Sequence, residues 1–530
     1  MRARQGFLRP FGLGACLALA LSGLPATVLG QGDEGAPLSA IDWLQQALEA
    51  PLPQSSVPEG VFLPDGNGVV VPQTHFESIL SAPLEGLGLE AVGLFRAERV
   101  GLPRDLWGNS PRSEVIAALS AMPQDGLPSA MRLGLRVLLA EFLPPRDDMP
   151  QSRDALLLAR LDKLVALGAL EQAGQLIEGV AEASAGVNAR AFEIALLLGE
   201  EDRACTQMRG QIAASYGHAA QIFCMARNGE WQAAYAGLQV ARGLGLLSMA
   251  EAGILLRFLE EEESDLPPPP PQEITPLGWR IMEALGDPVT TAGLPIAYAH
   301  ADLRGTSGWR AQLDAAERLT RAGVLQPNRL YGLYTERRAA ASGGLWERVR
   351  AMQALERALA SGDSAATGAA LVQAWPIFAE VDLEVALAEI LAPVMVDMPV
   401  TGQARDVLWK VLILAQEQSG RAADLAPDTV LARLVMALAA GEALPQVSAP
   451  PMAAAIVVGF GAVAVPAAVQ DQIAQGARGL VLLDALGLLS QAAAGDVQAA
   501  SEAMYRLRAL GLEALARQVA IELLLVERRG

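Results

Sequence analysis

Two cysteines, Cys205 and Cys224, are the residues of this chain whose chemistry is easiest to state. The third cysteine, Cys16, lies in an apolar N-terminal run that we expect to be removed, which leaves an even pair. Two thiols persist as a disulfide in an oxidising compartment, because nothing there reduces them. We therefore predict a Cys205–Cys224 disulfide. The alternative is two free, buried cysteines that pack as small core residues.

Other residues that commonly do chemistry are sparse. The histidines are His75, His218 and His300, and none lies at a metal-ligand interval from another, so we predict no metal site. Phosphate-binding GxxxxGK[ST] loops, GxSxG serine elbows and dinucleotide fingerprints in a strand-turn-helix context are also missing from the sequence. We expect no cofactor, and an NTPase or an α/β-hydrolase is disfavoured.

Glu77-Ser78 is similar to the catalytic Glu-Ser of lytic transglycosylases. That resemblance implies that Glu77 protonates a glycosidic oxygen of peptidoglycan. The dipeptide follows a proline-rich segment, and the later motifs of those enzymes are missing. An envelope enzyme acting on peptidoglycan is therefore an alternative to our main hypothesis.

An arginine-rich stretch concentrates positive charge in a chain whose formal net charge is -19. Arginine and aromatic residues are favoured at protein interfaces, so this stretch is a candidate docking patch for an acidic partner. The alternative is a solvated helix face on which the arginines pair with Glu336 and Glu347. The patch residues are Arg329, Tyr331, Tyr334, Arg337, Arg338 and Trp346. The overall acidity argues against nucleic acid as a partner, because the chain would repel a phosphate backbone.

Residues 1–30 are typical of a cleaved signal peptide. Arginines at the start precede an apolar run from Phe11 to Leu24, and small residues follow up to Gly30. We predict cleavage after Gly30 and export to the periplasm. A retained membrane anchor is disfavoured, because the apolar run is shorter than the ~20 residues that a span needs. A lipoprotein modified at Cys16 is disfavoured because the run continues past that cysteine.

Prolines divide the exported chain into regions. Residues 31–150 are proline-rich and mixed, with a small β-hairpin predicted where Asp65-Gly66-Asn67-Gly68 joins two β-branched runs. A helix is predicted to begin with Ser110 as N-cap and Pro111 at its first position. Residues 151–259 form a helical-repeat domain, residues 260–276 an acidic polyproline linker, and residues 277–530 a second helical-repeat domain.

Glycines at near-constant spacing mark the most regular region. Gly168, Gly199 and Gly229 are each followed by a small residue, namely Ala173, Ala204 and Ala233. A helix that ends at the glycine and another that starts just after it make a hairpin, and such hairpins stack. Gly362, Gly420 and Gly495 are spaced less regularly, and we expect each of them to separate two helices. The predicted fold class is all-α, an α-solenoid of stacked helical hairpins.

The stretch Ala219 to Ala241 resembles the tetratricopeptide-repeat superfamily over about residues 155–245. The comparable small and large positions are Phe223, Cys224, Gly229, Trp231, Ala233 and Ala234. The resemblance implies a fold and carries no binding residue. Short stretches such as 101–107, 334–338 and 510–513 also resemble uncharacterised exported proteins of alphaproteobacteria, which implies a Gram-negative periplasm.

Met452 to Val469 carries no charge and invites a transmembrane interpretation. The segment is rich in alanine and glycine, Pro466 interrupts it, and Asp471 follows it, so we predict a buried helix instead.

Our main hypothesis is a non-catalytic periplasmic scaffold or adaptor that binds another protein or an envelope component. A membrane-tethered assembly factor is a further alternative. The sequence assigns no oligomeric state.

Overall fold

The computed structural model describes residues 89–526 except 147, 149–152, 209–215, 261–273, 449 and 462–465. The predicted signal segment, the predicted hairpin near Asp65, His75, Glu77 and the run of five prolines lie outside these residues. Residues 82–530 group into one compact unit, separate from residues 1–81.

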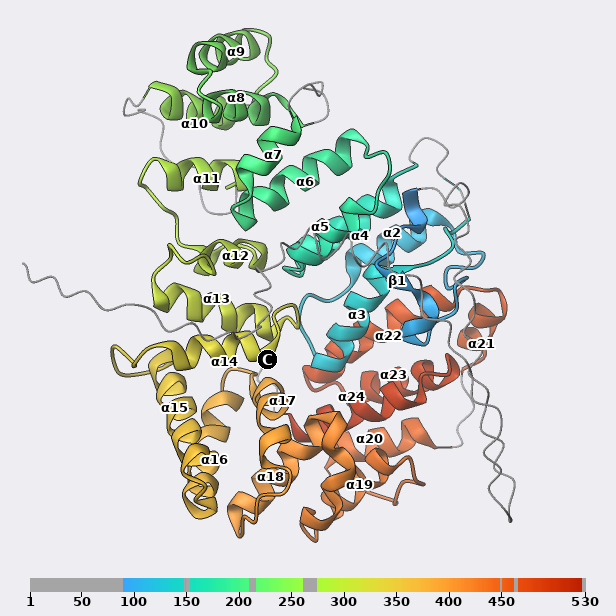
Figure 1. Cartoon of the computed structure of the whole chain (residues 1–530). Helices are drawn as coiled ribbons and strands as arrows, with labels where there is room; N and C mark the ends of the chain where they lie inside the picture. The colour runs from blue at the N-terminus through green and yellow to red at the C-terminus, as the bar shows by residue number, and fades with distance from the viewer. Residues whose placement is uncertain are drawn as a thin grey trace, which may run out of the picture. The chain divides into compact units, whose positions relative to one another are not determined.

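The described chain is all-α, as the composition predicts, and its helices stack as hairpins (Figure 1). The first part holds two short strands, β1 and β2, which pair in parallel. This pair is not the predicted hairpin, whose residues are not described. The elements of this part are η1 (Leu89–Ala91), β1 (Phe95–Arg96), η2 (Ala97–Val100), α2 (Arg112–Ala121), α3 (Pro128–Leu139) and β2 (Ala140–Glu141).

The regular region forms successive helices, each in contact with the next. They are α4 (Ala155–Ala166), α5 (Leu170–Glu178), α6 (Ala185–Leu198), α7 (Glu201–Met208), α8 (His218–Arg227), α9 (Trp231–Gly243) and α10 (Met249–Glu260). Gly168, Gly199 and Gly229 all have φ between 78° and 84°, the left-handed conformation that ends a helix without steric cost in glycine. Each lies between one helix and the next, as predicted.

One detail of this repeat was wrong. Ala173 and Ala204 are buried, but Ala233 is exposed and its neighbour Ala234 is fully buried. The inward-facing small residue therefore follows the glycine at the same interval in all three hairpins. Helix geometry explains the choice, because successive residues on a helix point about 100° apart and only one of two neighbours can face the core.

The rest of the chain continues as helices. They are α11 (Pro276–Ala284), η5 (Thr291–Gly293), η6 (Ile296–Tyr298), α12 (Ala299–Asp302), α13 (Trp309–Arg321), α14 (Pro327–Glu336), α15 (Leu345–Ser361), α16 (Ser364–Ala379), α17 (Glu384–Met395), α18 (Gln403–Leu414), η7 (Gln416–Arg421), η8 (Ala423–Leu425), α19 (Val430–Ala440), α20 (Pro451–Phe460), α21 (Ala467–Ala474), α22 (Arg478–Ala493), α23 (Val497–Ala509) and α24 (Glu513–Leu525). Gly362 and Gly495 separate helices as expected. Gly420 does not, since it lies inside η7.

The predicted start of the helix near Ser110 is one residue early. The N-cap of α2 is Pro111, and Ser110 lies before it, buried and without a hydrogen-bond partner for its hydroxyl within the described part of the chain. Pro111 instead forms a β-bridge with Arg146. A tertiary contact has therefore moved the helix boundary that the local sequence favours.

The uncharged segment from Met452 is not one helix. α20 ends at Phe460, and α21 begins at Ala467. Ala453 and Ile456 are buried, as predicted for this segment, whereas Val458 is half exposed. None of the helices within the described ranges combines the length and the apolar character that a membrane crossing requires.

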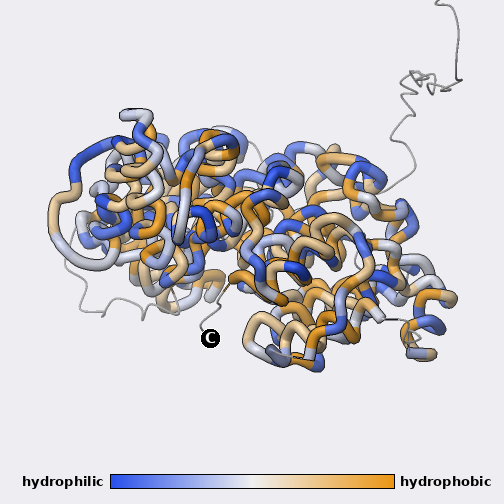
Figure 2. Tube along the Cα trace, turned by 90° about the horizontal axis from the view of Figure 1, so that it is seen from below, coloured by the Kyte–Doolittle hydropathy of each residue, from blue (hydrophilic) through white to orange (hydrophobic). Residues whose placement is uncertain are grey.

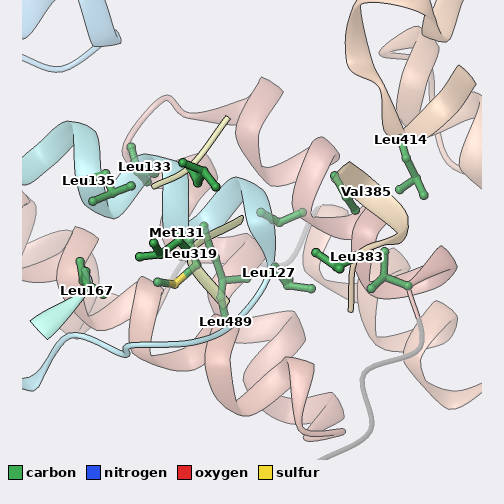
Figure 3. Packing of buried hydrophobic residues seen from close by; sticks show 14 of the residues in the cluster. Leu127, Met131, Leu133, Leu135, Leu167, Leu319, Leu383, Val385, Leu414 and Leu489 are labelled. Carbon is green, nitrogen blue, oxygen red and sulfur yellow. The ribbon is translucent and has the colours of Figure 1, made fainter. Parts of the chain in front are cut away.

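The main apolar core joins the two ends of the described chain. α2 packs on α22, and α3 packs on α22 and α24. Figure 2 shows hydrophobic and hydrophilic residues alternating within single helices, the pattern of helices that bury one face. Figure 3 shows how this core draws on distant segments, with Leu127 from the start of α3, Leu319 from α13, Leu383 before α17 and Leu489 from α22.

Candidate functional site

A cleft of about 460 Å³ opens where five segments meet, one of them η6 with Ile296. Its walls are the α2–α3 connection, the C-terminal turn of α13, the turn before α17 and the C-terminal turn of α22. The charged and polar lining residues are Gln124, Asp125, Arg318, Arg321, Asp382 and Ser490. Its volume is in the range of sites that hold small molecules or peptide segments.

Two further clefts continue from this one. A narrow section of about 70 Å³ shares Arg321 and Asp382 with the first cleft. A third cleft, of about 300 Å³, shares Arg132 and Glu389 with the narrow section. We call these three adjoining spaces the charged groove. Each junction along it is lined by one arginine and one carboxylate.

A fully buried carboxylate lies beside the groove. Glu522 of α24 accepts hydrogen bonds from the backbone nitrogen of Ser129 at 3.1 Å and from its hydroxyl at 2.5 Å. Arg132 lies 3.8 Å from Glu522 and 2.7 Å from Glu389. The amide of Gln416 also donates to the Ser129 hydroxyl. This polar cluster joins α3 to α17, η7 and α24, which all lie more than two hundred residues farther along the chain.

Backbone strain lies at the same place. Asp382 and Gln416 are the non-glycine residues with positive φ among those the structure describes, at 57° and 44°. This conformation costs a residue with a side chain of the order of 1 kcal/mol, and it persists where surrounding contacts impose it, often at functional sites. Both residues line the groove.

The groove is therefore lined by charges of both signs. No group of three or more His, Cys, Asp or Glu side chains that could hold a metal ion occurs within the described ranges. The narrow section is lined by two arginines and two carboxylates, so the formal charge of its lining is close to zero.

Only some residues of the predicted docking patch lie at the surface. Tyr334 is fully buried and donates to Glu317, which also accepts two 2.7 Å bonds from Arg348. Burial next to the Glu317 carboxylate raises the pKa of Tyr334 well above its usual range. Tyr334 is thus a core residue that joins α13, α14 and α15, and it was wrong to assign it to a surface.

The remaining patch residues are at or near the surface. Trp346 is half-buried against Trp309, with ring centroids 5.2 Å apart. Tyr331 donates to Glu356. Arg337 pairs with Glu336, and Arg329 lies 3.5 Å from Glu171; Arg329, Arg337 and Arg338 are exposed. Docking at these side chains stays a prediction.

Cys205 in α7 and Cys224 in α8 lie at disulfide-bonding distance, with Cα atoms 5.2 Å apart. Both side chains are buried. The pair that the sequence predicts is therefore brought together, by two neighbouring helices of the regular region.

Of the histidines that the structure describes, His218 is half-buried and His300 is buried. The Nε2 atom of His300 lies 2.6 Å from the carbonyl oxygen of Gly168 and donates its hydrogen to it. Burial lowers the pKa of His300, and the Gly168 contact opposes that shift. His300 thus fastens α12 to the turn between α4 and α5 and takes no part in the groove.

Comparison with protein-family models found no match, and comparisons with curated proteins and with solved structures found none either.

Sequence reasoning missed the groove. Arg132, Arg321, Asp382 and Glu389 occupy ordinary positions in helices or turns, and no spacing along the chain links them. Glu522 alone left a signal, because it interrupts the apolar run from Val519 to Leu525. A charge inside such a run indicates a buried, paired carboxylate.

Proposed function

We propose that this chain is a non-catalytic scaffold of the periplasm whose charged groove holds an extended segment of another protein. Stacked helical hairpins commonly serve as binding surfaces. The observation that carries the proposal is the continuity of the groove. Clefts of about 460 and 300 Å³ each share two lining residues with a smaller space of about 70 Å³, a series that suits a polypeptide strand better than a rounded ligand.

Export to the periplasm is part of this proposal and rests on residues 1–30. The Cys205–Cys224 pair supports it, since disulfides are stable in that compartment and rare in the cytosol. The peptidoglycan enzyme and the membrane-tethered assembly factor have no supporting observation within the described residues.

A groove-blocking substitution tests the proposal. Ala494 is exposed and lines the widest cleft, so Ala494→Trp should fill that space without disturbing the core. Ala360 on α15 is equally exposed and is not among the groove residues; Ala360→Trp is the matched control. Twelve-residue peptides would be selected from a random displayed library on the mature, full-length protein, and their Kd values measured by fluorescence anisotropy.

We expect the selected peptides to lose at least tenfold in affinity for the Ala494→Trp variant and to bind the Ala360→Trp variant as they bind the unchanged protein. A factor of ten corresponds to about 1.4 kcal/mol. The proposal fails if the library yields no peptide, or if the peptides bind the Ala494→Trp variant unchanged while its thermal unfolding is unaltered.

A further inference from the structure

We propose that the Cys205–Cys224 pair is a redox switch for helix α7: the helix is docked while the disulfide is closed and is released when both cysteines are reduced. The inference does not depend on the charged groove. It depends on how little else holds α7 in place, compared with the helices near it (Figure 1).

α7 is short and buries few apolar side chains. It has eight residues. Isolated helices shorter than ~12–15 residues are only marginally stable in water, so a helix of this length depends on its tertiary contacts. Among Glu201 to Gln207, the buried residues are Glu201, Ala204 and Cys205. Two small residues therefore make the apolar contact of this part of α7, and one of them carries the covalent link.

The helices near α7 bury larger apolar side chains. α5 has nine residues and is almost as short, yet Leu170, Ala173 and Leu176 are all fully buried. α8 buries Ile222 and Phe223. Because the burial of large apolar side chains is the main favourable contribution to docking a helix, we expect α5 and α8 to stay in place without a covalent link. α7 lacks that contribution.

Ion pairs are the other side-chain interactions that hold α7 against its neighbours. Asp202 and Arg203 form theirs at the surface, where such pairs contribute little. Glu201 is buried and pairs with Arg280 of α11, whose Nε atom lies 3.0 Å from it. The cost of removing these two charges from water offsets much of their attraction. The release of α7 would break this pair between α7 and α11.

Opening the disulfide takes two electrons and two protons, which a dithiol supplies. A thiolate of the dithiol attacks one cysteine sulfur, forms a mixed disulfide and releases the other cysteine as a thiolate that takes up a proton. The second thiolate of the reductant then attacks the mixed disulfide, closes a disulfide within the reductant and releases the remaining cysteine. Cys205 and Cys224 are 2% and 4% exposed, so the exchange requires a local opening at α7.

Hydrogen exchange with mass spectrometry on the full-length protein tests the inference. The probe is dithiothreitol, a small dithiol, and alkylation at the end of the reaction reports how far both cysteines are reduced. The control protein is the Cys205→Ala/Cys224→Ala double variant, in which the reductant has no disulfide to open. α5 is the internal control, because it is close to α7 in length and contains no cysteine.

We expect reduction to raise hydrogen exchange in α7 roughly a hundredfold, the equilibrium factor that closure of a loop of this length supplies in the chain-entropy model. Exchange in α5 should stay unchanged, and exchange in α8 should rise less than in α7. The double variant should exchange in α7 like the reduced protein, and dithiothreitol should not change it further.

Glu201→Gln supplies a second measurement, which separates a switch from a disulfide that is merely structural. It should lower the midpoint of thermal unfolding of the oxidised protein, because Arg280 loses its buried partner. It should leave the midpoint of the reduced protein unchanged, because α7 is already released there.

Unchanged exchange in α7 after reduction would overturn the inference. So would a rise in α5 equal to that in α7, because the disulfide would then stabilise the whole unit instead of one helix. A disulfide that dithiothreitol does not reduce in the folded protein would exclude a switch, and so would an equal effect of Glu201→Gln on the oxidised and reduced proteins.

Discussion

The hairpin arm, residues 201–260 with helices α7 to α10, differs sharply from the region around the charged groove. The arm packs around an apolar cluster that includes Phe223 and Leu255 and that it shares with Phe192 of α6 and Ile281 of α11. Its helices contact their neighbours in sequence, as the green helices in Figure 1 show. The groove region joins residues such as Ser129 and Glu522, which are 393 positions apart. Local contacts build the arm, and long-range contacts build the groove.

The two regions also differ at their surfaces. The arm exposes large apolar side chains, among them Val240, Leu244 and Met249, which are 60%, 68% and 83% exposed. The groove instead is lined by arginines and carboxylates. Leu383 and Val385, which also line it, belong to the apolar core drawn in Figure 3. An ion pair from Glu201 to Arg280 of α11 ties the start of the arm to the rest of the unit. The two surfaces of this chain therefore differ in chemistry, one being apolar and the other charged.

The largest expected effect is in the groove region. Glu522→Ala removes a fully buried carboxylate and leaves the Ser129 donors without it, so we expect a loss of roughly 3–5 kcal/mol in unfolding free energy. Glu389→Ala removes the partly exposed partner of the same Arg132 and should cost less than about 1 kcal/mol. Urea unfolding followed by circular dichroism measures both. Equal losses would show that burial does not decide the strength of this cluster.

Removing the disulfide should destabilise the arm and leave the groove region unchanged. Replacing Cys205 and Cys224 together by alanine removes a closure across 19 residues, which is worth about 3 kcal/mol in the chain-entropy model. Hydrogen exchange should rise in α7, α8 and α9 and stay unchanged in α3 and α24. An equal rise in hydrogen exchange in both regions would contradict this contrast, because the stability of the arm would then not be separate from that of the groove region.

The smallest effect should come from His300, which lies in neither region. Burial lowers its pKa below the ordinary value of 6.5, so between the folded and unfolded pKa values the unfolded chain binds more protons. Stability should therefore fall as the pH drops below about 6.5, until the folded pKa is reached. The His300→Gln variant keeps a donor toward Gly168 and should show a weaker fall between pH 7.5 and pH 5.5. An identical pH dependence in both proteins would assign the change to other groups.

The sequence predicts the regular helical hairpins better than it predicts the groove. The glycine spacing at Gly168, Gly199 and Gly229 predicts the hairpins, because a left-handed glycine ends a helix by local sterics alone. The Cys205–Cys224 pairing follows from those hairpins, since neighbouring helices bring residues that are close in sequence together. Choosing Ala233 instead of Ala234 shows the limit, because two adjacent small residues differ only in the direction that packing selects.

The groove could not be predicted in the same way. Ser129, Arg132, Arg321 and Asp382 have no common spacing or motif, and Tyr334 was assigned to the surface because its neighbours in sequence are arginines. The sequence by itself determined that the chain is helical and where the helices of the regular region end, since those outcomes depend on local conformation and amphipathic periodicity. Only the tertiary structure decided which helix ends meet, because that depends on packing between segments hundreds of residues apart, and the charged groove exists only where they meet.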